Sequence, residues 1–516
     1  MAPDGSTAGA VARPTHVDPV PLSDVASRLG AAADLPSVDV TGLTASSSLV
    51  QRGDLYAGLP GARTHGARFA EVARDAGAVA ILTDADGAEL AASSGLPTVV
   101  VGEPRRILGS VAAQVYGRPA DAFTLIGVTG TQGKTTVTHL IAAGAAAAGR
   151  ITAVIGTNGA SIAGEPLSSV LTTPEAPELH ALFAVMRERG VDVCAIEVSS
   201  HALVMGRVDG VVFDLGVFTN LGRDHLDFHR DMDDYFEAKA QLFAPDRSRR
   251  ALVSIDDAWG LRLAIDARLE TQTYSADDAV ADWVGVLDVA ESTPHQTVFS
   301  LRGPRGLGLR AAVAMAGAFN VANAVAAIAA CAAVGVDPED AARGIAAVGS
   351  VRGRMEVVSG DRPFSVVVDY AHKPDAVVAA LDALRSVTRG RLLIVIGAGG
   401  DRDRGKRPLM GKASAERADV VVVTDDNPRS EDPAEIRSEI LAGARGAATA
   451  ADIREVGDRA DAIEAALREA APGDTVLIAG KGHEAGQEIG DRVLPFDDRA
   501  TALAVLMRLD EERPAP

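Results

Sequence analysis

The 516-residue sequence has little cysteine, no excess of positive charge and no long apolar run. Its two cysteines, Cys194 and Cys331, each lie in an apolar segment. This excludes a disulfide scaffold and a cysteine-based zinc site, and it predicts a reducing, cytoplasmic location. Fifty Lys and Arg residues against 70 Asp and Glu residues give a net charge of −20. Such an acidic balance argues against nucleic-acid and membrane-surface partners.

The longest apolar stretch, Val321–Val336, is rich in alanine, includes Asn323 and is shorter than the roughly 20 residues of a membrane span. It predicts a buried helix, so we expect no membrane insertion. Residues 1–22 have neither a basic start nor an apolar core that would indicate a targeting segment, and they predict a flexible tail. The remaining length suggests about three globular domains.

Short apolar runs alternate with helical patterns, which predicts an α/β fold. We predict a smaller N-terminal α/β domain at residues 23–120, a central domain with a P-loop-type parallel sheet at 121–354, and a C-terminal Rossmann-like domain at 355–516. The strands predicted for the last two domains are 123–129, 152–155, 191–198, 211–218, 365–369, 392–396, 420–424 and 475–478. Because ligands bind at the carboxyl ends of such strands, we expect functional residues in the loops that follow them.

The clearest motif is a phosphate-binding loop. The strand at 123–129 is followed by Gly130-Thr131-Gln132-Gly133-Lys134-Thr135-Thr136 and a helical segment that ends at Ala148. The glycines allow backbone N–H groups to face phosphates, and the helix N-terminus adds positive potential. We predict that Lys134 reaches the β- and γ-phosphates and that the Thr135 hydroxyl binds Mg²⁺. The alternative is a glycine-rich turn with an exposed lysine.

Two other residues allow two interpretations each, and a third allows one. Glu197 ends the strand at 191–198, where either a second metal-binding carboxylate or a turn cap is expected. His225 follows the strand at 211–218 and is a candidate ligand for a second Mg²⁺, although Mg²⁺ prefers oxygen, so a hydrogen-bonded loop histidine is the alternative. The pattern around Lys239 is that of a solvated lysine on an amphipathic helix.

Taken together and in order, the motifs resemble those of the Mur ligases, the ATP-dependent amide-forming enzymes of peptidoglycan synthesis. The resemblance extends from Thr44 to Asp498 and is strongest to members that join diaminopimelate to UDP-N-acetylmuramoyl-L-alanyl-D-glutamate. The motifs beyond the phosphate loop are Thr172-Thr-Pro174, Glu197-Val-Ser-Ser-His201, Asn220 with Asp224-His225, Glu237-Ala-Lys239, Asn320-Val-Ala-Asn323, Gly353-Arg-Met-Glu356, Asp369-Tyr-Ala-His-Lys-Pro374, Gly399-Gly-Asp-Arg-Asp403, Asp426-Asn-Pro-Arg429 and Gly480-Lys-Gly-His-Glu484.

The resemblance implies ATP and Mg²⁺ as cofactors and small molecules as partners. It implies that Lys239 is carbamylated and becomes an anionic ligand. The implied metal ligands are Thr135, Glu197, His225 and Lys239, and the implied catalytic residues are Lys134, Glu197, His225 and Lys239. The residues implied around ATP, besides Gly130–Thr136, are Asn320, Asn323, Arg354 and Asp369. Those implied for the UDP-muramoyl dipeptide are Ser47, Thr172, Thr173, Ser199 and Arg207. Where the family usually has Asp-Ser-Arg, this chain has Ser46-Ser47-Ser48.

The amino-acid site is expected in the C-terminal domain. Diaminopimelate carries a distal carboxylate that lysine lacks, and arginine binds such a group bidentately. We therefore expect Arg429 to select it; the alternative is a surface residue paired with Asp425 or Glu431. The full predicted set is Arg402, Asp426, Asn427, Pro428, Arg429, Gly480 and Glu484.

The function implied is ligation of meso-2,6-diaminopimelate to the dipeptide through an acyl phosphate, by a cytoplasmic monomer. Three alternatives stand beside it. They are an L-lysine ligase of the same family, a folylpolyglutamate synthase, and a catalytically silent nucleotide-binding scaffold of cell-wall assembly. The N-terminal α/β block and the segment 426–429 argue against the synthase. Retention of Lys134, Thr135, Glu197, His225 and Lys239 argues against the scaffold.

Overall fold

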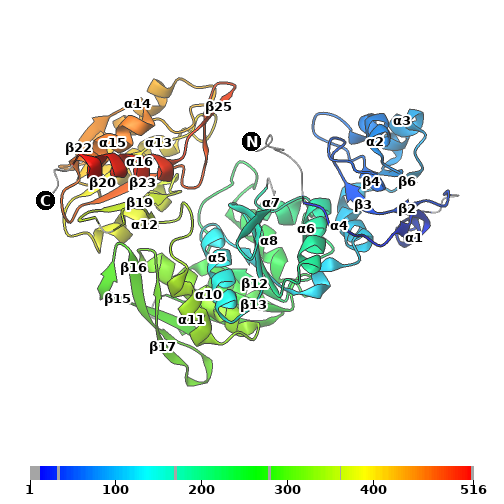
Figure 1. Ribbon diagram of the computed structural model, residues 1–516, viewed down its shortest axis with the longest axis horizontal. Coiled ribbons are helices and arrows are strands. Elements are labelled where there is room, and N and C mark those ends of the chain that lie inside the picture. The colour runs from blue at the N-terminus through cyan, green and yellow to red at the C-terminus, as the bar shows by residue number, and fades with distance from the viewer. Residues whose placement is uncertain (1–11, 32–34, 168–170, 277–279, 361, 513–516) are drawn as a thin grey trace. The chain divides into compact units, whose positions relative to one another are not determined.

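The computed structural model describes residues 12–31, 35–167, 171–276, 280–360 and 362–512 (Figure 1). The chain divides into two compact units, described separately below. The first comprises Met1–Tyr274 and Ala326–Ala341, and the second comprises Ser275–Val325 and Ala342–Pro516. The domain boundaries at 120/121 and 354/355 stay predictions.

The first unit opens with a four-stranded parallel sheet in the order β3-β4-β5-β6 (Figure 1). Alternate side chains point to opposite faces. Leu43, Leu55 and Leu82 join one apolar cluster, with residues of α4, and Tyr56 and Ile81 join another, with residues of α2. The elements of this part are β1 (Val20–Pro21), α1 (Leu22–Arg28), β2 (Asp39–Val40), β3 (Gly42–Thr44), β4 (Asp54–Ala57), η1 (Gly66–Phe69), α2 (Ala70–Ala76), β5 (Ala80–Thr83), α3 (Ala85–Ala91), η2 (Ala92–Ser94), β6 (Thr98–Val100), α4 (Pro104–Val115) and η3 (Pro119–Ala122).

The segment predicted as a flexible tail lies partly outside the described residues, because these begin at Ala12. In the described part, Arg13 donates from Nη2 to the buried Asp54 at 3.0 Å and from Nη1 to Tyr116 at 2.7 Å. Glu188 accepts hydrogen bonds from the backbone of Thr15 and the residue after it. Burial raises the pKa of Asp54, and the Arg13 guanidinium opposes this effect.

The central sheet of the first unit has the order β10-β9-β8-β11-β7-β12-β13-β14. The six neighbouring strands β8, β11, β7, β12, β13 and β14 run parallel. Strand β9 is antiparallel to β8, and β10 is antiparallel to β9. The carboxyl ends of β7, β8, β11 and β12 therefore share one edge. The elements are β7 (Thr124–Thr129), α5 (Lys134–Ala147), β8 (Thr152–Gly156), β9 (Gly159–Ile162), β10 (Glu165–Leu167), α6 (Ala176–Glu188), β11 (Val193–Glu197), α7 (Ser200–Val204), β12 (Leu215–Phe218), α8 (Met232–Ala240), η4 (Gln241–Phe243), β13 (Arg250–Ser254), α9 (Ala258–Asp266) and β14 (Glu270–Ser275).

These strands confirm the predicted parallel α/β sheet, with small differences at strand ends. β12 begins at Leu215 and not at Val211. The carboxylate of Asp214 accepts from the backbone of Leu125 at 2.9 Å, so a side chain takes a donor that a longer strand would have paired. The helix after the phosphate loop ends at Ala147, where Gly149 adopts φ 79°, a left-handed conformation typical of helix C-termini.

The second unit contains an antiparallel set β15-β16-β17 and a six-stranded sheet ordered β18-β19-β23-β20-β21-β22. Helices α10 and α11 are each divided between the two units, because residues 326–341 belong to the first. In this sheet only β18 is antiparallel to its neighbour. The elements are β15 (Trp283–Thr293), β16 (Gln296–Arg302), η5 (Pro304–Gly306), β17 (Gly308–Val313), α10 (Ala318–Ala333), α11 (Pro338–Ala347), β18 (Glu356–Val357), β19 (Ser365–Asp369), α12 (Pro374–Arg385), β20 (Leu392–Ile396), α13 (Lys406–Ala415), β21 (Val420–Val423), α14 (Pro433–Arg445), β22 (Asp452–Glu455), α15 (Arg459–Glu469), β23 (Thr475–Ala479), β24 (Gly486–Ile489), β25 (Arg492–Pro495) and α16 (Asp498–Glu511).

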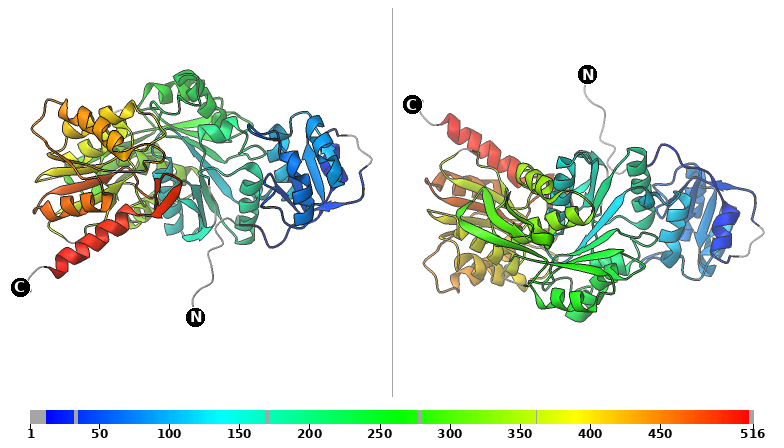
Figure 2. Two further views of the ribbon diagram at one scale, coloured as in Figure 1. Left: turned by 90° about the horizontal axis from the view of Figure 1, so that it is seen from above. Right: turned by 90° about the horizontal axis from the view of Figure 1, so that it is seen from below.

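Helices cover both faces of the six-stranded sheet. Val366 and Val368 of β19 pack in one cluster with Ile463 of α15 and Leu506 of α16. The opposite face contacts α12, α13 and α14. Figure 2 shows α16, in red, on one side of the sheet and the yellow and orange helices of the other face beyond it. This arrangement confirms the predicted Rossmann-like layering.

The predicted buried helix at residues 321–336 is confirmed as α10. Its side chains at Val321, Val325 and Ile328 are fully buried. No helix among the described residues combines the length and the apolar character that crossing a membrane requires.

A fully buried ion pair joins two helices of the second unit to its sheet. Arg459, at the start of α15, donates from Nε and Nη2 to the two carboxylate oxygens of Asp498, at the start of α16, both at 2.7 Å. The same Nη2 donates to the carbonyl of Ala479, the last residue of β23, at 2.9 Å. Both side chains have no exposed surface, so neither charge has water to replace a lost partner.

We expect Arg459→Ala to lower the free energy of unfolding by about 3–5 kcal/mol, because it leaves the Asp498 carboxylate buried without a cation. The measurement is denaturant unfolding of the full chain. Arg468→Ala, on the same helix but in exposed pairs with Glu464 and Glu512, is the matched control and should change stability little. Equal stability of the two variants would contradict this assignment.

Candidate active site

The phosphate loop is hydrogen-bonded to the loop that follows β12. The backbone N–H of Gln132 donates to Asn220 Oδ1 at 2.9 Å, and Thr219 Oγ1 donates to the Gln132 carbonyl at 2.6 Å. Gly130 has φ 149°, and an added Cβ would lie 1.9 Å from Thr219 Oγ1. A side chain at position 130 would therefore disrupt this contact. The loop ends at Gly133, φ 85°, which is the N-cap of α5.

Two lysine ammonium groups meet on one carbonyl of this loop. Lys134 Nζ donates to the carbonyl of Gly130 at 2.8 Å and to that of Thr131 at 3.0 Å. Lys239 Nζ, from α8, donates to the same Gly130 carbonyl at 2.7 Å and lies 4.7 Å from the centre of the Tyr235 ring. The two cations are thus neighbours at the point where the motif predicts phosphate.

The pattern-based reading of Lys239 as solvated is wrong, because only 1% of the residue is exposed. Its face of α8 is turned toward the phosphate loop, and Tyr235 on the same helix also meets that loop through Thr131 Oγ1 at 3.2 Å. Burial raises the pKa of Tyr235. Thr135 and Thr136, at the start of α5, are buried as well.

His225 lies in the loop after β12, with a side chain 43% exposed and its Nε2 3.3 Å from Asp224 Oδ2. Its φ of 52° is in the left-handed region. Its ring lies 4.9 Å from that of His201 and 6.0 Å from that of Tyr235. His225 and Lys239 therefore both neighbour Tyr235, so the structure brings these two predicted metal ligands into one region.

Glu197 is the last residue of β11 and pairs with Val128 of β7, the strand that precedes the phosphate loop. Its carboxylate accepts from the backbone N–H of Thr157 at 2.7 Å and from the Thr157 hydroxyl at 3.1 Å. Only 1% of the residue is exposed. Gly156, the last residue of β8, leaves room for it, since an added Cβ would lie 2.2 Å from Glu197 Oε1.

The residues predicted for the dipeptide substrate gather around Thr173. Thr173 Oγ1 donates to the Glu197 carbonyl at 2.8 Å, and Arg207 Nη1 donates to the Thr173 carbonyl at 3.2 Å. The Thr172 hydroxyl lies 3.2 Å from that of Thr157. Ser199 caps α7 by accepting from Ala202. These residues thus form one cluster next to Glu197.

Ser47 lies apart from this cluster, in the loop after β3 of the N-terminal sheet. The hydroxyls of its neighbours Ser46 and Ser48 are 2.9 Å apart. The predicted role of Ser47 stays a prediction.

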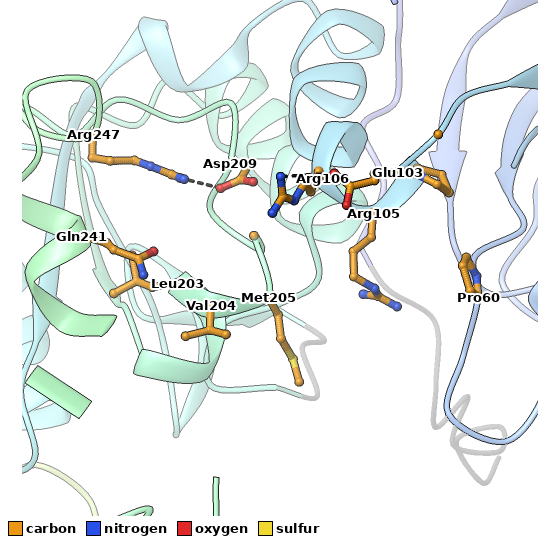
Figure 3. A pocket seen from close by; sticks show the side chains of 13 residues that line it. Pro60, Glu103, Arg105, Arg106, Leu203, Val204, Met205, Asp209, Gln241 and Arg247 are labelled. Atoms are coloured by element: carbon orange, nitrogen blue, oxygen red, sulfur yellow. Dashed lines mark ion pairs between the residues drawn. The ribbon is translucent and has the colours of Figure 1, made fainter. Parts of the chain in front are cut away.

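A cavity of about 720 Å³ lies beside the dipeptide cluster. Glu175 connects the two, because it pairs with Arg207 at 2.9 Å and with the cavity residue Arg105 at 3.6 Å. Figure 3 shows Arg105 and its neighbour at the start of α4, and across the cavity the ion pair of Arg247 with Asp209. The start of α4 thus lines one wall of the cavity with two arginines, which pair with Glu175 and Glu103.

The nucleotide residues predicted in the second unit form two pairs. Asn323 Nδ2 donates to Asn320 Oδ1 at 3.0 Å, one turn apart at the start of α10. Asp369 accepts from the backbone of Met355 at 2.8 Å. Burial raises the pKa of Asp369, whereas the nearby Arg354 opposes this effect. The Arg354 guanidinium lies 4.7 Å from the centre of the Tyr370 ring.

The predicted amino-acid site is organised by a residue that sequence reasoning did not assign. Lys481 has no exposed surface, and its Nζ donates to Asn427 Oδ1 at 2.8 Å and to Glu484 Oε2 at 3.2 Å. It also lies 3.5 Å from Asp426 Oδ1. Asn427 Nδ2 donates to Glu484 Oε2 at 2.9 Å. Gly480, φ 117°, faces the Asp426 carboxylate, where an added Cβ would lie 2.8 Å away.

Arg429 does not pair with Asp425 or Glu431, the partners of its alternative interpretation. Its Nε donates to Glu488 Oε2 at 2.6 Å and its Nη1 to the Gly400 carbonyl at 2.8 Å. Asp425 instead forms an ion pair with Arg437, and Glu431 forms one with Arg407. Arg429 Nη2 has no hydrogen-bond partner within the described ranges.

Two other members of the set are Pro428, which precedes this arginine, and Arg402, in the loop after β20. Pro428 contacts Gly400 closely, since a Cβ there would lie 1.9 Å from the Pro428 carbonyl oxygen. Arg402 is exposed. The part of the chain that the structure describes contains no ion pair of Arg402.

The donors fit Mg²⁺ held together with a nucleotide. Mg²⁺ is usually bound by one or two protein carboxylates or hydroxyls, with phosphates and waters completing the shell. Thr135, at the start of α5, and Glu197, at the end of β11, supply such groups, and both follow or adjoin β7. Across the described residues no cluster of three or more His, Cys, Asp or Glu has the arrangement of a metal site made by protein alone.

Positions that contact the predicted residues but carried no predicted role include Thr157, Thr219, Tyr235, Lys481 and Glu488. Lys481 could have been assigned from the sequence, because it lies inside the motif at 480–484. Thr219 and Tyr235 flank predicted motifs without matching one. Glu488 had no signal in the sequence, since its importance comes from the pairing of a hairpin with the segment 426–429.

Three segments of the chain match known domains of one family. Residues 39–116 match the Mur ligase family catalytic domain, residues 128–331 the Mur ligase middle domain, and residues 353–482 the Mur ligase glutamate ligase domain. A relative from Streptomyces coelicolor, named UDP-N-acetylmuramoyl-L-alanyl-D-glutamate–2,6-diaminopimelate ligase, is 52% identical over 490 residues. The match covers 94% of this chain and 96% of the relative.

Two solved structures share the fold. One, titled as the structure of a UDP-N-acetylmuramoyl-L-alanyl-D-glutamate–2,6-diaminopimelate ligase, has a TM-score of 0.68 and 31% identity, covering 96% of this chain and all of the other. Folylpolyglutamate synthase of Mycobacterium tuberculosis, solved with ADP and AMPPCP, has a TM-score of 0.57 and 20% identity over 79% of this chain and 95% of its own. The second likeness concerns the fold alone.

The contact between Gly156 and Glu197 yields a test of the metal assignment. We expect Gly156→Ala to weaken Mg²⁺-dependent nucleotide binding roughly tenfold, because a methyl group would displace the carboxylate. Calorimetry with and without Mg²⁺ measures this, and binding without Mg²⁺ should be unchanged. Gly308→Ala, where an added Cβ meets no described atom within 4 Å, is the control. Equal losses with and without Mg²⁺ would contradict a metal role.

Proposed function

The chain belongs to the Mur ligase family, and on this premise we propose that it ligates meso-2,6-diaminopimelate to UDP-N-acetylmuramoyl-L-alanyl-D-glutamate with hydrolysis of ATP to ADP and phosphate. This reaction is a step of peptidoglycan precursor synthesis in the cytoplasm, and we propose that a monomer performs it. The choice of amino acid rests on Arg429, which lies beside the Lys481 cluster. Its Nη2 group has no hydrogen-bond partner among the described residues.

In the first step a substrate carboxylate oxygen attacks the γ-phosphorus of ATP. An O–P bond forms, the bond to ADP breaks, and an acyl phosphate results. Two anions must approach each other, so cations in the site lower the barrier. Lys134 is proposed for this role, because its ammonium already lies over the phosphate loop at 2.8 Å from the Gly130 carbonyl. Bound phosphate would replace that carbonyl as its partner.

We propose that Lys239 acts as a carbamate. The ammonium first loses a proton to give the neutral amine, and the amine then adds to CO₂ and loses a second proton, so that a cation becomes a carboxylate-like anion. The close approach of Lys239 and Lys134 to one carbonyl supports this change, since it removes a repulsion between two ammonium groups in a low-dielectric site.

The proposed Mg²⁺ ligands are Thr135, Glu197, His225 and carbamylated Lys239. Bound Mg²⁺ would neutralise charge on the phosphates as the acyl phosphate forms. Thr157 holds the Glu197 carboxylate by two hydrogen bonds, so this ligand is oriented before any metal binds.

The dipeptide substrate is proposed to lie along the cluster around Thr173. Thr172, Thr173, Ser199 and Arg207 supply donors for its amide and carboxylate groups. The neighbouring cavity carries Arg105 and Arg106 on its wall, and arginine side chains suit the anionic diphosphate of a UDP-sugar. Ser47 is proposed to contact the uridine end.

In the second step the amine of diaminopimelate attacks the acyl carbon, phosphate leaves, and the nitrogen loses a proton. Arg429 is proposed to bind the distal carboxylate of the amino acid, and Glu484 its distal ammonium. Arg402, Asp426, Asn427, Pro428 and Gly480 complete the proposed site. The ATP side of the second unit is proposed to use Asn320, Asn323, Arg354 and Asp369. Lysine would leave Arg429 without a carboxylate, and sites built around such a contact discriminate by roughly 10⁴–10⁵.

The decisive experiment supplies the wild-type chain with ATP, Mg²⁺, the UDP-muramoyl dipeptide and one amino acid at a time, and measures phosphate release and product mass. We expect a product with diaminopimelate and little with L-lysine. A lysine product would favour the lysine ligase. Nucleotide binding without any product would favour the scaffold, and a product from a folate substrate would favour the synthase.

We expect Lys239→Ala and Lys239→Gln to lower kcat by roughly 10²–10³, because neither can form the carbamate that holds the metal. Phosphate release measures this, and bicarbonate or small carboxylates should partly restore Lys239→Ala. Asp233→Ala changes an exposed residue of the same helix and should retain activity. Wild-type rates in either Lys239 variant would contradict the carbamate.

We expect Arg429→Ala to raise the diaminopimelate KM roughly 10- to 100-fold, because the distal carboxylate loses charge-assisted hydrogen bonds. Steady-state kinetics should show an unchanged KM for ATP. Arg445→Ala, an exposed arginine of α14, is the control. An unchanged preference for diaminopimelate over lysine in Arg429→Ala would exclude this role.

A further inference from the structure

The hairpin β24–β25 is joined to the amino-acid segment 426–429 by backbone hydrogen bonds. The backbone N–H of Arg429 donates to the carbonyl of Glu488 at 3.0 Å, and the N–H of Gly490 donates to the Arg429 carbonyl at 2.8 Å. The N–H of Glu488 donates to Asn427 Oδ1 at 3.0 Å. Position 488 is therefore fixed against the segment without any help from its own side chain.

The side chain of Glu488 adds a single contact. Its Oε2 accepts from Arg429 Nε at 2.6 Å. On the opposite side of the guanidinium, Nη1 donates to the Gly400 carbonyl at 2.8 Å. Arg429 also has φ 53°, so its backbone leaves the common regions to reach this position. The guanidinium is thus held at two sites in one orientation.

These contacts leave some N–H donors of the Arg429 guanidinium available to a ligand. A guanidinium has five N–H donors, and a carboxylate binds it best through two of them. Glu488 engages Nε and not Nη2 as well, so it does not occupy a bidentate edge. These two bonds use one N–H of Nε and one of Nη1, so the Nη1/Nη2 edge keeps three of the five donors. Arg429 is 23% exposed at its side chain, which leaves it accessible to a ligand.

We propose that Glu488 is a positioning residue for amino-acid selection. It holds Arg429 so that the Nη1/Nη2 edge faces the distal carboxylate of the substrate. This inference rests on the proposed function. It concerns the choice between diaminopimelate and lysine and not the chemistry of ligation. A flexible arginine would lose rotamer entropy on binding the ligand, and a held arginine has lost it already.

The test measures steady-state kinetics with diaminopimelate and L-lysine for wild type, Glu488→Ala, Glu488→Gln and the double variant Glu488→Ala/Arg429→Ala. We expect Glu488→Ala to raise the diaminopimelate KM roughly tenfold, with kcat and the ATP KM unchanged. Glu488→Gln keeps an acceptor oxygen and should show a smaller rise. In the Arg429→Ala background, loss of Glu488 should have no further effect.

Asp491→Asn is the matched control, because it removes the same charge from an exposed position of the same hairpin. Thermal unfolding identifies a variant that fails to fold, and Glu488→Gln then decides the question. The inference is overturned if Glu488→Ala equals Asp491→Asn, if it lowers the diaminopimelate KM, or if it acts equally on the Arg429→Ala background. If the wild type does not ligate diaminopimelate, the proposed function fails and this inference with it. Failure of the variants alone overturns only the inference.

Discussion

A buried charge must have partners, and this requirement organises the phosphate loop, the proposed amino-acid site and the packing of two helices on the C-terminal sheet. Lys239, Lys481 and Arg459 are each at most 1% exposed. Leaving such a group without a partner costs several kcal/mol, so the surrounding loops must present carbonyls and carboxylates to it. Lys239 thereby fixes the phosphate loop, and Lys481 collects the side chains of the amino-acid site. Arg459 ties two helices to the end of β23.

These pairings act on loops that parallel strands already bring to one edge. Parallel sheets with helices on both faces leave their carboxyl ends as the place where side chains from distant segments meet. In the first unit the loops after β7, β11 and β12 meet there, and in the second unit the loops after β20, β21 and β23 do. The sheets supply proximity, and the buried charges supply orientation. Preorganised orientation of this kind is what acyl transfer through a charged intermediate requires.

Small residues set how closely these loops approach. Gly130 is in contact with Thr219, Gly156 with Glu197, and Gly480 with Asp426, and each contact is closer than a Cβ would permit. The functional groups are therefore held by backbone as much as by side chains. This explains why residues with no chemistry of their own recur inside the motifs that carry the proposed function.

The sequence by itself determined the α/β class, the parallel strands, the phosphate loop and the family, because these depend on local periodicity and on short motifs. It also marked nearly every proposed site residue, through the order of those motifs. The tertiary structure alone decided that Lys239 is buried under the phosphate loop, although its pattern is that of a solvated lysine. It alone decided that Arg429 pairs with Glu488 and not with Asp425. The physical reason is that burial and ion pairing depend on which segments pack together. The local sequence of a helix or a hairpin does not show which distant segment will pack against it.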